Sequence, residues 1–176
     1  MENLPALPES SAAPFSGQYL IVQLQEESFG LDISVVREII AYSAPTSVPM
    51  MPNFVLGVIN LRGQVVPVID MAVRFGRKET SIFKRSCIII LDFEEGSQKH
   101  RLGIVVDAVN EVIELTSQQI EPAPQFGTGL RHDFLRGMGK INDRFIVLLD
   151  MGKVLSLEEM AQLVSLNGAA NSEADD

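Results

Sequence analysis

The sequence contains one cysteine, two histidines and no tryptophan. Because Cys87 has no second cysteine to pair with, an internal disulfide is excluded. His100 and His132 stand alone in polar stretches, without further ligands at the spacing that a metal site needs. We therefore expect no disulfide framework, no metal and no cofactor.

Basic residues are also scarce, since 14 Lys and Arg face 23 Asp and Glu, a formal net charge of −9. Affinity for nucleic acid and for anionic membrane comes from neutralising phosphate, so this charge argues against both partners. The apolar runs 87–91 and 145–149 are far shorter than the ~20 residues that cross a bilayer. The first residues also lack the basic start and apolar stretch of a secretory signal. The sequence predicts a soluble, cytoplasmic protein that does not insert into the membrane.

Patterns of a catalytic centre are missing as well. Cys87 opens an apolar stretch, where a thiol usually behaves as a small buried hydrophobe rather than a nucleophile. Residues 137–140 resemble a phosphate-binding loop, but the upstream glycine is absent and Ile141 replaces the hydroxyl residue. The acidic pair 94–95 lies before a glycine and is typical of a solvated hairpin turn. The sequence predicts a binding module rather than an enzyme.

What the sequence does contain is a pattern of short β-strands. Val and Ile together make up 32 of the 176 residues, and β-branched side chains favour strands. Residues 19–25 and 29–33 alternate apolar and polar side chains on either side of a polar turn. Residues 57–61 and 64–70 form a second apolar pair around a turn in which Gly63 can supply a positive φ. Both pairs are predicted to be β-hairpins.

The pattern occurs twice along the chain. Residues 29–40 align without gaps on 102–113, and residues 57–70 align on 137–150, with apolar positions and turns in the same order. The two alignments have offsets of 73 and 80 residues, which places one insertion in the second half, most simply at 122–129. We infer a duplicated, strand-rich unit.

The repeat predicts how the chain is divided. Five short strands in about 70 residues are too few for a stable flat sheet, so each unit is expected to close into a small barrel. An S-x-x-E capping box precedes apolar residues at helical spacing after the second unit. The expected parts are a disordered tail at 1–16, a first barrel at 17–84, a second barrel at 85–155, an amphipathic helix at 156–167 and a disordered acidic tail at 168–176.

The first unit also carries segments with a specific residue pattern. They are the run GVINLRGQVVPVID at 57–70, the tripeptide at 29–31, the run VREII at 36–40, and the pairs at 48–49 and 54–55. Together these segments closely resemble the CheW family of chemotaxis coupling proteins, and the likeness extends over residues 17–166.

The resemblance implies a mainly β protein with two SH3-like, five-stranded β-barrel subdomains, in which 17–167 form one CheW-like domain without catalytic activity. Its partners would be the cytoplasmic tips of chemoreceptors (methyl-accepting chemotaxis proteins) and the regulatory domain of a CheA-type histidine kinase. It would give receptors control over kinase autophosphorylation and support array assembly, in the cytoplasm at membrane receptor arrays.

The resemblance also implies a receptor-facing groove between the barrels, lined by Val36, Glu38, Gly57 and Arg62. We expect Arg62 to leave its hairpin turn and pair with Glu38 across the groove. Taken alone, an arginine in a turn is usually just solvated, a valine in a helical turn is usually core, and Gly57 has a backbone explanation in its counterpart at 137.

No short motif marks the kinase-facing surface. We place it on the first barrel, on residues of the opening hairpin expected to point outward, such as Ile21 and Asp32.

Two alternatives stay open. The chain could be a CheW-like coupling subunit of a parallel pathway that controls surface motility or gene expression, in which only the receptor partner differs. It could also be a small sheet-rich enzyme or ligand binder with its site at the junction of the barrels, where pockets are common.

Overall fold

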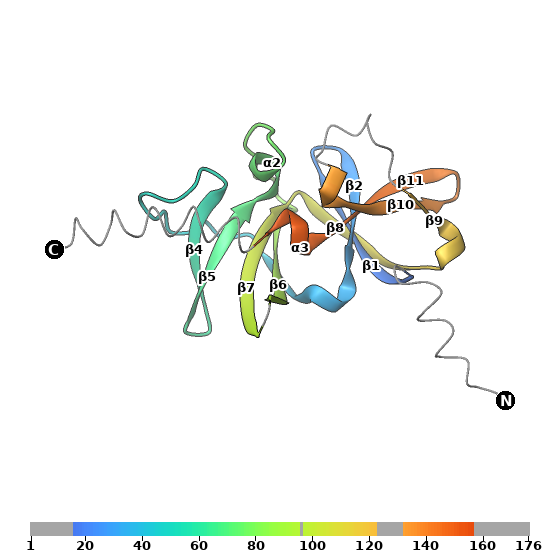
Figure 1. Cartoon of the computed structure of the whole chain (residues 1–176). Helices are drawn as coiled ribbons and strands as arrows, with labels where there is room; N and C mark the ends of the chain where they lie inside the picture. The colour runs from blue at the N-terminus through green and yellow to red at the C-terminus, as the bar shows by residue number, and fades with distance from the viewer. Residues whose placement is uncertain (1–15, 96, 123–131, 157–176) are drawn as a thin grey trace.

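The computed structural model describes residues 16–95, 97–122 and 132–156, which are mainly β-strand with few helices (Figure 1). The predicted helix at 156–167, apart from its first residue, and the acidic tail lie outside the described residues, as does nearly all of the N-terminal tail. The strands are β1 (Gly17–Leu24), β2 (Glu27–Asp32), β3 (Val36–Ala41), β4 (Val55–Leu61), β5 (Gln64–Asp70), β6 (Cys87–Glu95), β7 (Gln98–Val106), β8 (Ala108–Leu115), β9 (Ile120–Glu121), β10 (Leu135–Ile141) and β11 (Arg144–Leu149). The short helices are η1 (Ile33–Val35), α2 (Met71–Arg74), η2 (Ser117–Gln119), η3 (His132–Phe134) and α3 (Met151–Val154).

The strands form two sheets that have the same strand order. Sheet A runs β8-β1-β2-β11-β10-β9, and sheet B runs β3-β6-β7-β5-β4. The two-residue β9 beside β10 is matched in sheet B by a single bridge between Thr46 and Val58 of β4. The parallel pairing of Gly30 with Leu148 in sheet A likewise matches that of Gly103 with Val68 in sheet B. This repetition agrees with the predicted duplication.

The predicted boundary at 84/85 does not separate the two sheets. The opening hairpin β1–β2 belongs to sheet A with strands of the second half, and the hairpin β6–β7 belongs to sheet B with strands of the first half. Each unit therefore exchanges its first hairpin with the other. The exchange interlocks the halves, so neither 17–84 nor 85–155 contains a complete sheet.

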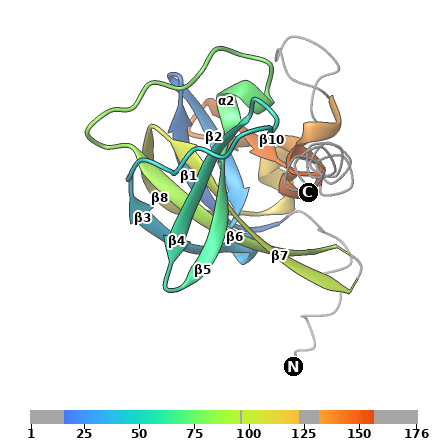
Figure 2. The ribbon, with the colours of Figure 1, turned by 90° about the vertical axis from the view of Figure 1, so that its left-hand side faces the viewer.

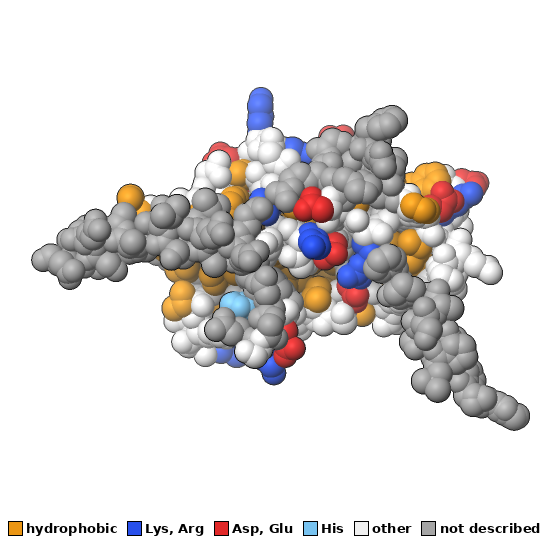
Figure 3. Space-filling view, in the orientation of Figure 1, with side chains coloured by type: hydrophobic (Ala, Val, Ile, Leu, Met, Phe, Trp, Pro, Cys, Tyr) orange, Lys and Arg blue, Asp and Glu red, His pale blue; other side chains and the backbone are white. Residues whose placement is uncertain are grey.

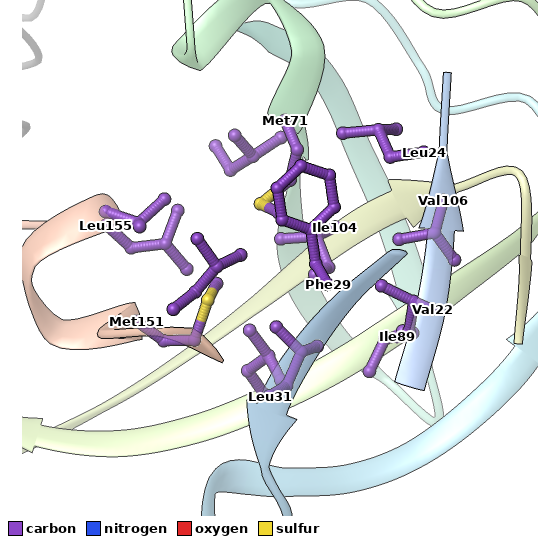
Figure 4. Close-up of a cluster of buried hydrophobic side chains, with 14 of the residues drawn as sticks. Val22, Leu24, Phe29, Leu31, Met71, Ile89, Ile104, Val106, Met151 and Leu155 are labelled. Carbon is purple, nitrogen blue, oxygen red and sulfur yellow. The ribbon is translucent and has the colours of Figure 1, made fainter. Parts of the chain in front are cut away.

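Three apolar clusters explain why both faces of many strands are apolar. Inside sheet A, Tyr19, Ile21 and Leu148 belong to one cluster. Inside sheet B, residues from all five strands form a second cluster, so the sheet curls around its own core. The third and largest cluster lies between the sheets, and Figure 4 shows β-strands and both α-helices contributing to it. The labelled residues there are Val22, Leu24, Phe29, Leu31, Met71, Ile89, Ile104, Val106, Met151 and Leu155.

Matching contacts hold α2 and α3 at the junction of the sheets. Asp70 N–H donates to the carbonyl of Phe54, and Asp150 N–H donates to that of Phe134, both at 2.8 Å. The Arg74 guanidinium carbon lies 5.5 Å from the Phe54 ring centroid and 5.1 Å from that of Phe134. Arg74 therefore ties together equivalent aromatic rings of the two units.

Candidate functional site

The predicted ion pair between Arg62 and Glu38 is present, and it links the two edge strands of sheet B, β3 and β4. Glu38 lies on β3, and Arg62 opens the turn between β4 and β5. Arg62 Nη2 donates to Glu38 Oε2. The Arg62 side chain is 66% exposed and that of Glu38 is 25% exposed. Such a pair contributes only about 0–1 kcal/mol to stability, so its main effect is to hold two side chains in a defined orientation.

The turn that carries Arg62 does not itself call for an arginine. Arg62 has φ 52° and Gly63 has φ 88°, the two positive values that a tight I′ hairpin turn requires. Asn and Gly tolerate this conformation best. The equivalent position in sheet A is Asn142, with φ 49°. Turn geometry therefore leaves the long basic side chain at position 62 unexplained.

A second ion network lies beside this pair on the same sheet. Arg101 of β7 donates to Asp92 of β6 at 2.7 and 3.0 Å, and to Gln64 of β5 at 2.5 Å. Arg37 of β3 reaches the same carboxylate at 3.2 Å. The hydrogen bond from Arg101 lowers the pKa of Asp92, and the same contact raises the pKa of Arg101.

The network borders a surface cavity of about 320 Å³. Its lining mixes both charge signs, because Glu94, Lys99 and His100 face it together with residues of the network. On the face drawn in Figure 3, acidic and basic side chains likewise lie next to one another rather than in a patch of one sign. This end of sheet B offers a polar surface that a partner with paired charges could match.

The other two predicted receptor residues have structural roles. Val36 is half-buried and packs against the cluster between the sheets. Gly57 is buried at φ 151°, and a Cβ there would lie 2.1 Å from the Thr46 carbonyl oxygen. All four predicted residues lie on β3, β4 or the turn after β4, so they belong to one sheet.

The predicted kinase-facing residues do not both point outward. Ile21 is only 2% exposed and lies in the core of sheet A, so the prediction that it is a surface contact is wrong. Asp32 is partly exposed, accepts a hydrogen bond from Ser34 N–H and pairs with Arg136 at 2.9 Å. Burial alone raises the pKa of Asp32, but these hydrogen bonds outweigh it, so the pKa lies below its ordinary value. Tyr19 completes this cluster through a hydrogen bond with Arg136.

The network of Arg37, Asp92 and Arg101 was not anticipated from the sequence. A signal for it exists, because Asp92 and Arg101 lie at equal distances from the hairpin turn and so face each other across β6 and β7. The signal for burying Ile21 is that both faces of β1 are apolar, which is typical of a strand covered on both sides.

The described part of the chain offers little for metal or thiol chemistry. Within it, no three His, Cys, Asp or Glu side chains come together as a metal site would require. Cys87 is half-buried, and its thiol donates to the Arg85 carbonyl at 3.3 Å. Among the same residues, no helix is long and apolar enough to cross a membrane.

Comparison with known proteins agrees with this architecture. The family model described as CheW-like domain matches residues 18–159. The chemotaxis protein CheW of Klebsiella aerogenes is 38% identical over 161 residues, which are 92% of this chain and 95% of the relative. A probable chemotaxis protein CheW of Rhizobium etli is 33% identical over 142 residues, 81% of this chain and 89% of the relative. The crystal structure of the scaffolding protein TtCheW from Thermoanaerobacter tengcongensis superposes with a TM-score of 0.70 at 35% identity, covering 80% of this chain and 88% of that one. This chain belongs to the CheW family.

Proposed function

We propose that this chain is a non-catalytic adaptor that couples the cytoplasmic tips of chemoreceptors to a CheA-type histidine kinase. In this role it brings receptor state to bear on kinase autophosphorylation and helps to assemble the receptor array, in the cytoplasm at the membrane-bound receptors. The proposal rests on membership of the CheW family over most of the chain and on one local observation: an exposed arginine is fixed across sheet B where turn geometry does not require one.

The geometry suggests how the receptor is recognised. Glu38 holds the Arg62 guanidinium at the end of sheet B, and the adjoining Arg37–Asp92–Arg101 network presents further fixed charges. Charges held in place before binding give specificity and orientation more than raw affinity. Val36 and Gly57 act behind this surface by keeping β3 and β4 in position. For the kinase-facing surface, Asp32 remains the proposed residue.

The test is co-sedimentation of the full chain with a receptor cytoplasmic fragment and CheA, followed by an assay of kinase autophosphorylation. We expect wild-type protein to bring CheA down with the receptor and to change kinase activity. Arg62→Glu should weaken receptor capture about tenfold or more while leaving CheA binding intact, because it reverses an orienting charge. Arg144→Glu makes the same charge change at an exposed residue of sheet A and should behave as wild type.

Kinase activity that is the same with and without this chain, at all concentrations, would contradict the coupling role. Equal losses for Arg62→Glu and Arg144→Glu would remove the assignment of the receptor surface to sheet B. The alternative, a coupling subunit of a parallel pathway for surface motility or gene regulation, uses the same surfaces. It predicts capture by the receptor of that pathway and none by a chemotaxis receptor.

A further inference from the structure

The loop between α2 and β6, residues 76–86, carries an exposed surface that the proposed coupling role does not use. At its tip, residues 81–85 are all exposed, and the adjacent Ile82 and Phe83 are 46% and 57% exposed. Lys84 and Arg85 follow them directly. We call these five residues the basic–apolar tip. In Figure 2 the loop is the long green segment that leads away from α2 along the upper left of the molecule.

Hydrogen bonds hold the tip in place from both sides. Before it, Thr80 N–H donates to the fully buried Asp70 carboxylate at 3.0 Å. After it, the buried Ser86 receives a hydrogen bond from Phe83 N–H on its hydroxyl at 2.7 Å and donates its own N–H to the Phe83 carbonyl at 3.1 Å. The Phe83 ring is therefore presented to solvent from an anchored turn, which lowers the entropy lost when a partner covers it.

The charge of this loop is opposite to that of the chain. Residues 76–86 contain four basic residues and one acidic residue, a local net charge of +3, so the rest of the −9 chain carries −12. Lys84 and Arg85 form no ion pair with any of the described residues. An apolar pair next to two unpartnered cations is complementary to a segment that combines carboxylates with an apolar side chain.

We propose that the basic–apolar tip docks a short acidic segment of a protein partner, with an apolar side chain of that segment on Ile82 and Phe83 and its carboxylates at Lys84 and Arg85. An anionic membrane fits less well. An extended negative surface would face the remaining −12 of the chain as well as the loop, whereas a short peptide interacts only within a Debye length of about 8 Å at physiological salt.

This surface is separate from the Arg62 end of sheet B. β5 runs from Gln64, beside the Arg62 turn, to Asp70 at the base of the loop, a length of roughly 20 Å for seven residues. Figure 1 shows α2 and the start of its loop at the top of the molecule and the β4–β5 turn at the bottom. A partner at the tip and a receptor at Arg62 can therefore bind at the same time.

The test measures binding of the full chain to a fluorescent helical peptide of about 15 residues, with Leu on one face and Glu on the others. The reference peptide has Lys in place of every Glu, and vesicles of phosphatidylglycerol and phosphatidylcholine serve as the membrane probe. We expect the acidic peptide to bind, the basic peptide not to bind, and the vesicles to bind no more than background. Raising the salt to about 1 M, where the Debye length is about 3 Å, should weaken peptide binding about tenfold.

The variant Phe83→Ser with Lys84→Glu should weaken acidic-peptide binding about tenfold or more, since it removes the apolar anchor and reverses a charge. The matched control is Phe145→Ser with Lys140→Glu, an exposed apolar–basic pair that faces across β10 and β11 and undergoes the same changes. It should bind as wild type. Equal loss in both variants, no peptide binding, or binding to anionic vesicles in place of the peptide would each overturn the proposal. Circular dichroism melting of both variants separates lost binding from lost fold.

Discussion

Sheets A and B are two versions of one skeleton. Strand order, hairpin turns and even the bulge between the first edge strand and its neighbour coincide, at Val36/Glu38 in sheet B and beside Val109 and Glu111 in sheet A. What differs is the polar chemistry placed on that skeleton. Apolar spacing and turn residues were therefore enough to keep the fold in both copies, while other positions were free to diverge.

The two sheets have diverged in polarity at one set of equivalent positions, which is partly exposed in sheet A. Sheet A contains the cluster of Tyr19, Asp32 and Arg136. The register places apolar residues at the equivalent positions of sheet B: Ile88 corresponds to Tyr19, Val105 to Asp32 and Leu56 to Arg136. Sheet B therefore shows that the skeleton does not require the polar cluster. In sheet A the cluster is a local specialisation whose members depend on one another.

Near the hairpin turns the difference in polarity is reversed, and sheet B is the more highly charged of the two. In sheet B, Arg101 pairs with Asp92, and at the equivalent place in sheet A the neutral Gln23 bonds to Ser28 at 2.6 Å. Arg62 and its partner Glu38 correspond to Asn142 and Glu111. Only sheet B thus presents an ion network at this end, among the described residues, which favours it as the receptor-facing surface.

The two equivalent glycines of β4 and β10 give the sharpest test of the comparison. Gly57→Ala should lower the free energy of unfolding by roughly 3 kcal/mol, because it combines a φ of 151° with a Cβ 2.1 Å from a backbone oxygen. Gly137 has no positive φ, and its Cβ would lie 2.9 Å from the Glu121 oxygen, so Gly137→Ala should cost only about 1 kcal/mol. Urea denaturation measures both. Equal effects would mean that Thr46 beside Gly57 and β9 beside Gly137 constrain their glycines to the same extent.

The polar cluster of sheet A gives the next largest effect. The single variant Arg136→Leu introduces the leucine found at the equivalent position of sheet B. It should destabilise the protein by about 2 kcal/mol, because it leaves the partly buried Asp32 carboxylate without its cation. Adding Tyr19→Ile and Asp32→Val gives sheet A all three apolar residues of sheet B. This triple variant should recover most of the lost stability, although it also removes the cap that Asp32 provides for η1. Thermal unfolding of the single and triple variants decides the matter. A triple variant that is less stable than the single one would show that the three residues of sheet A cannot be replaced by their equivalents in sheet B.

Much of the fold could be predicted from local pattern, and the unpredicted part has a physical cause. The positive φ of Gly63 follows from the spacing of residues within one hairpin. The Arg62–Glu38 pair joins residues that are 24 positions apart, and it was expected only from the resemblance to the CheW family. The exchange of hairpins could not be predicted, because β2 finds equivalent neighbours in β5 and β11, and the apolar pattern fits either pairing. The burial of Ile21 does not depend on that exchange, because its equivalent in sheet B, Ile90, is buried as well, and the two apolar faces of β1 were the signal for it.

Acid sensitivity should distinguish the two carboxylates that pair with arginine. The folded pKa of Asp32 lies below its ordinary value of 3.8, so its stabilisation is present above pH 3.8 and is lost as the pH falls through the folded pKa. The gap in stability between wild type and Asp32→Asn, about 1 kcal/mol at neutral pH, should therefore close below about pH 4. Asp92→Asn should show the same direction with a smaller gap, because its ion pairs are more exposed. A gap for Asp32→Asn that widens in acid would reverse the assigned direction of the shift.

The smallest effect on stability concerns the pair that we consider most important for function. Arg62→Asn installs the turn residue of sheet A, which suits a positive φ better, so the gain in the turn should nearly offset the lost ion pair and leave the unfolding free energy within about 0.5 kcal/mol of wild type. A double-mutant cycle with Glu38→Gln should give a coupling energy of about 0–1 kcal/mol. A coupling above about 2 kcal/mol would instead make the pair a structural clasp between β3 and the β4–β5 turn. With weak coupling, stability cannot explain why sheet B has an arginine where sheet A has an asparagine, and recognition of a partner is the explanation that fits.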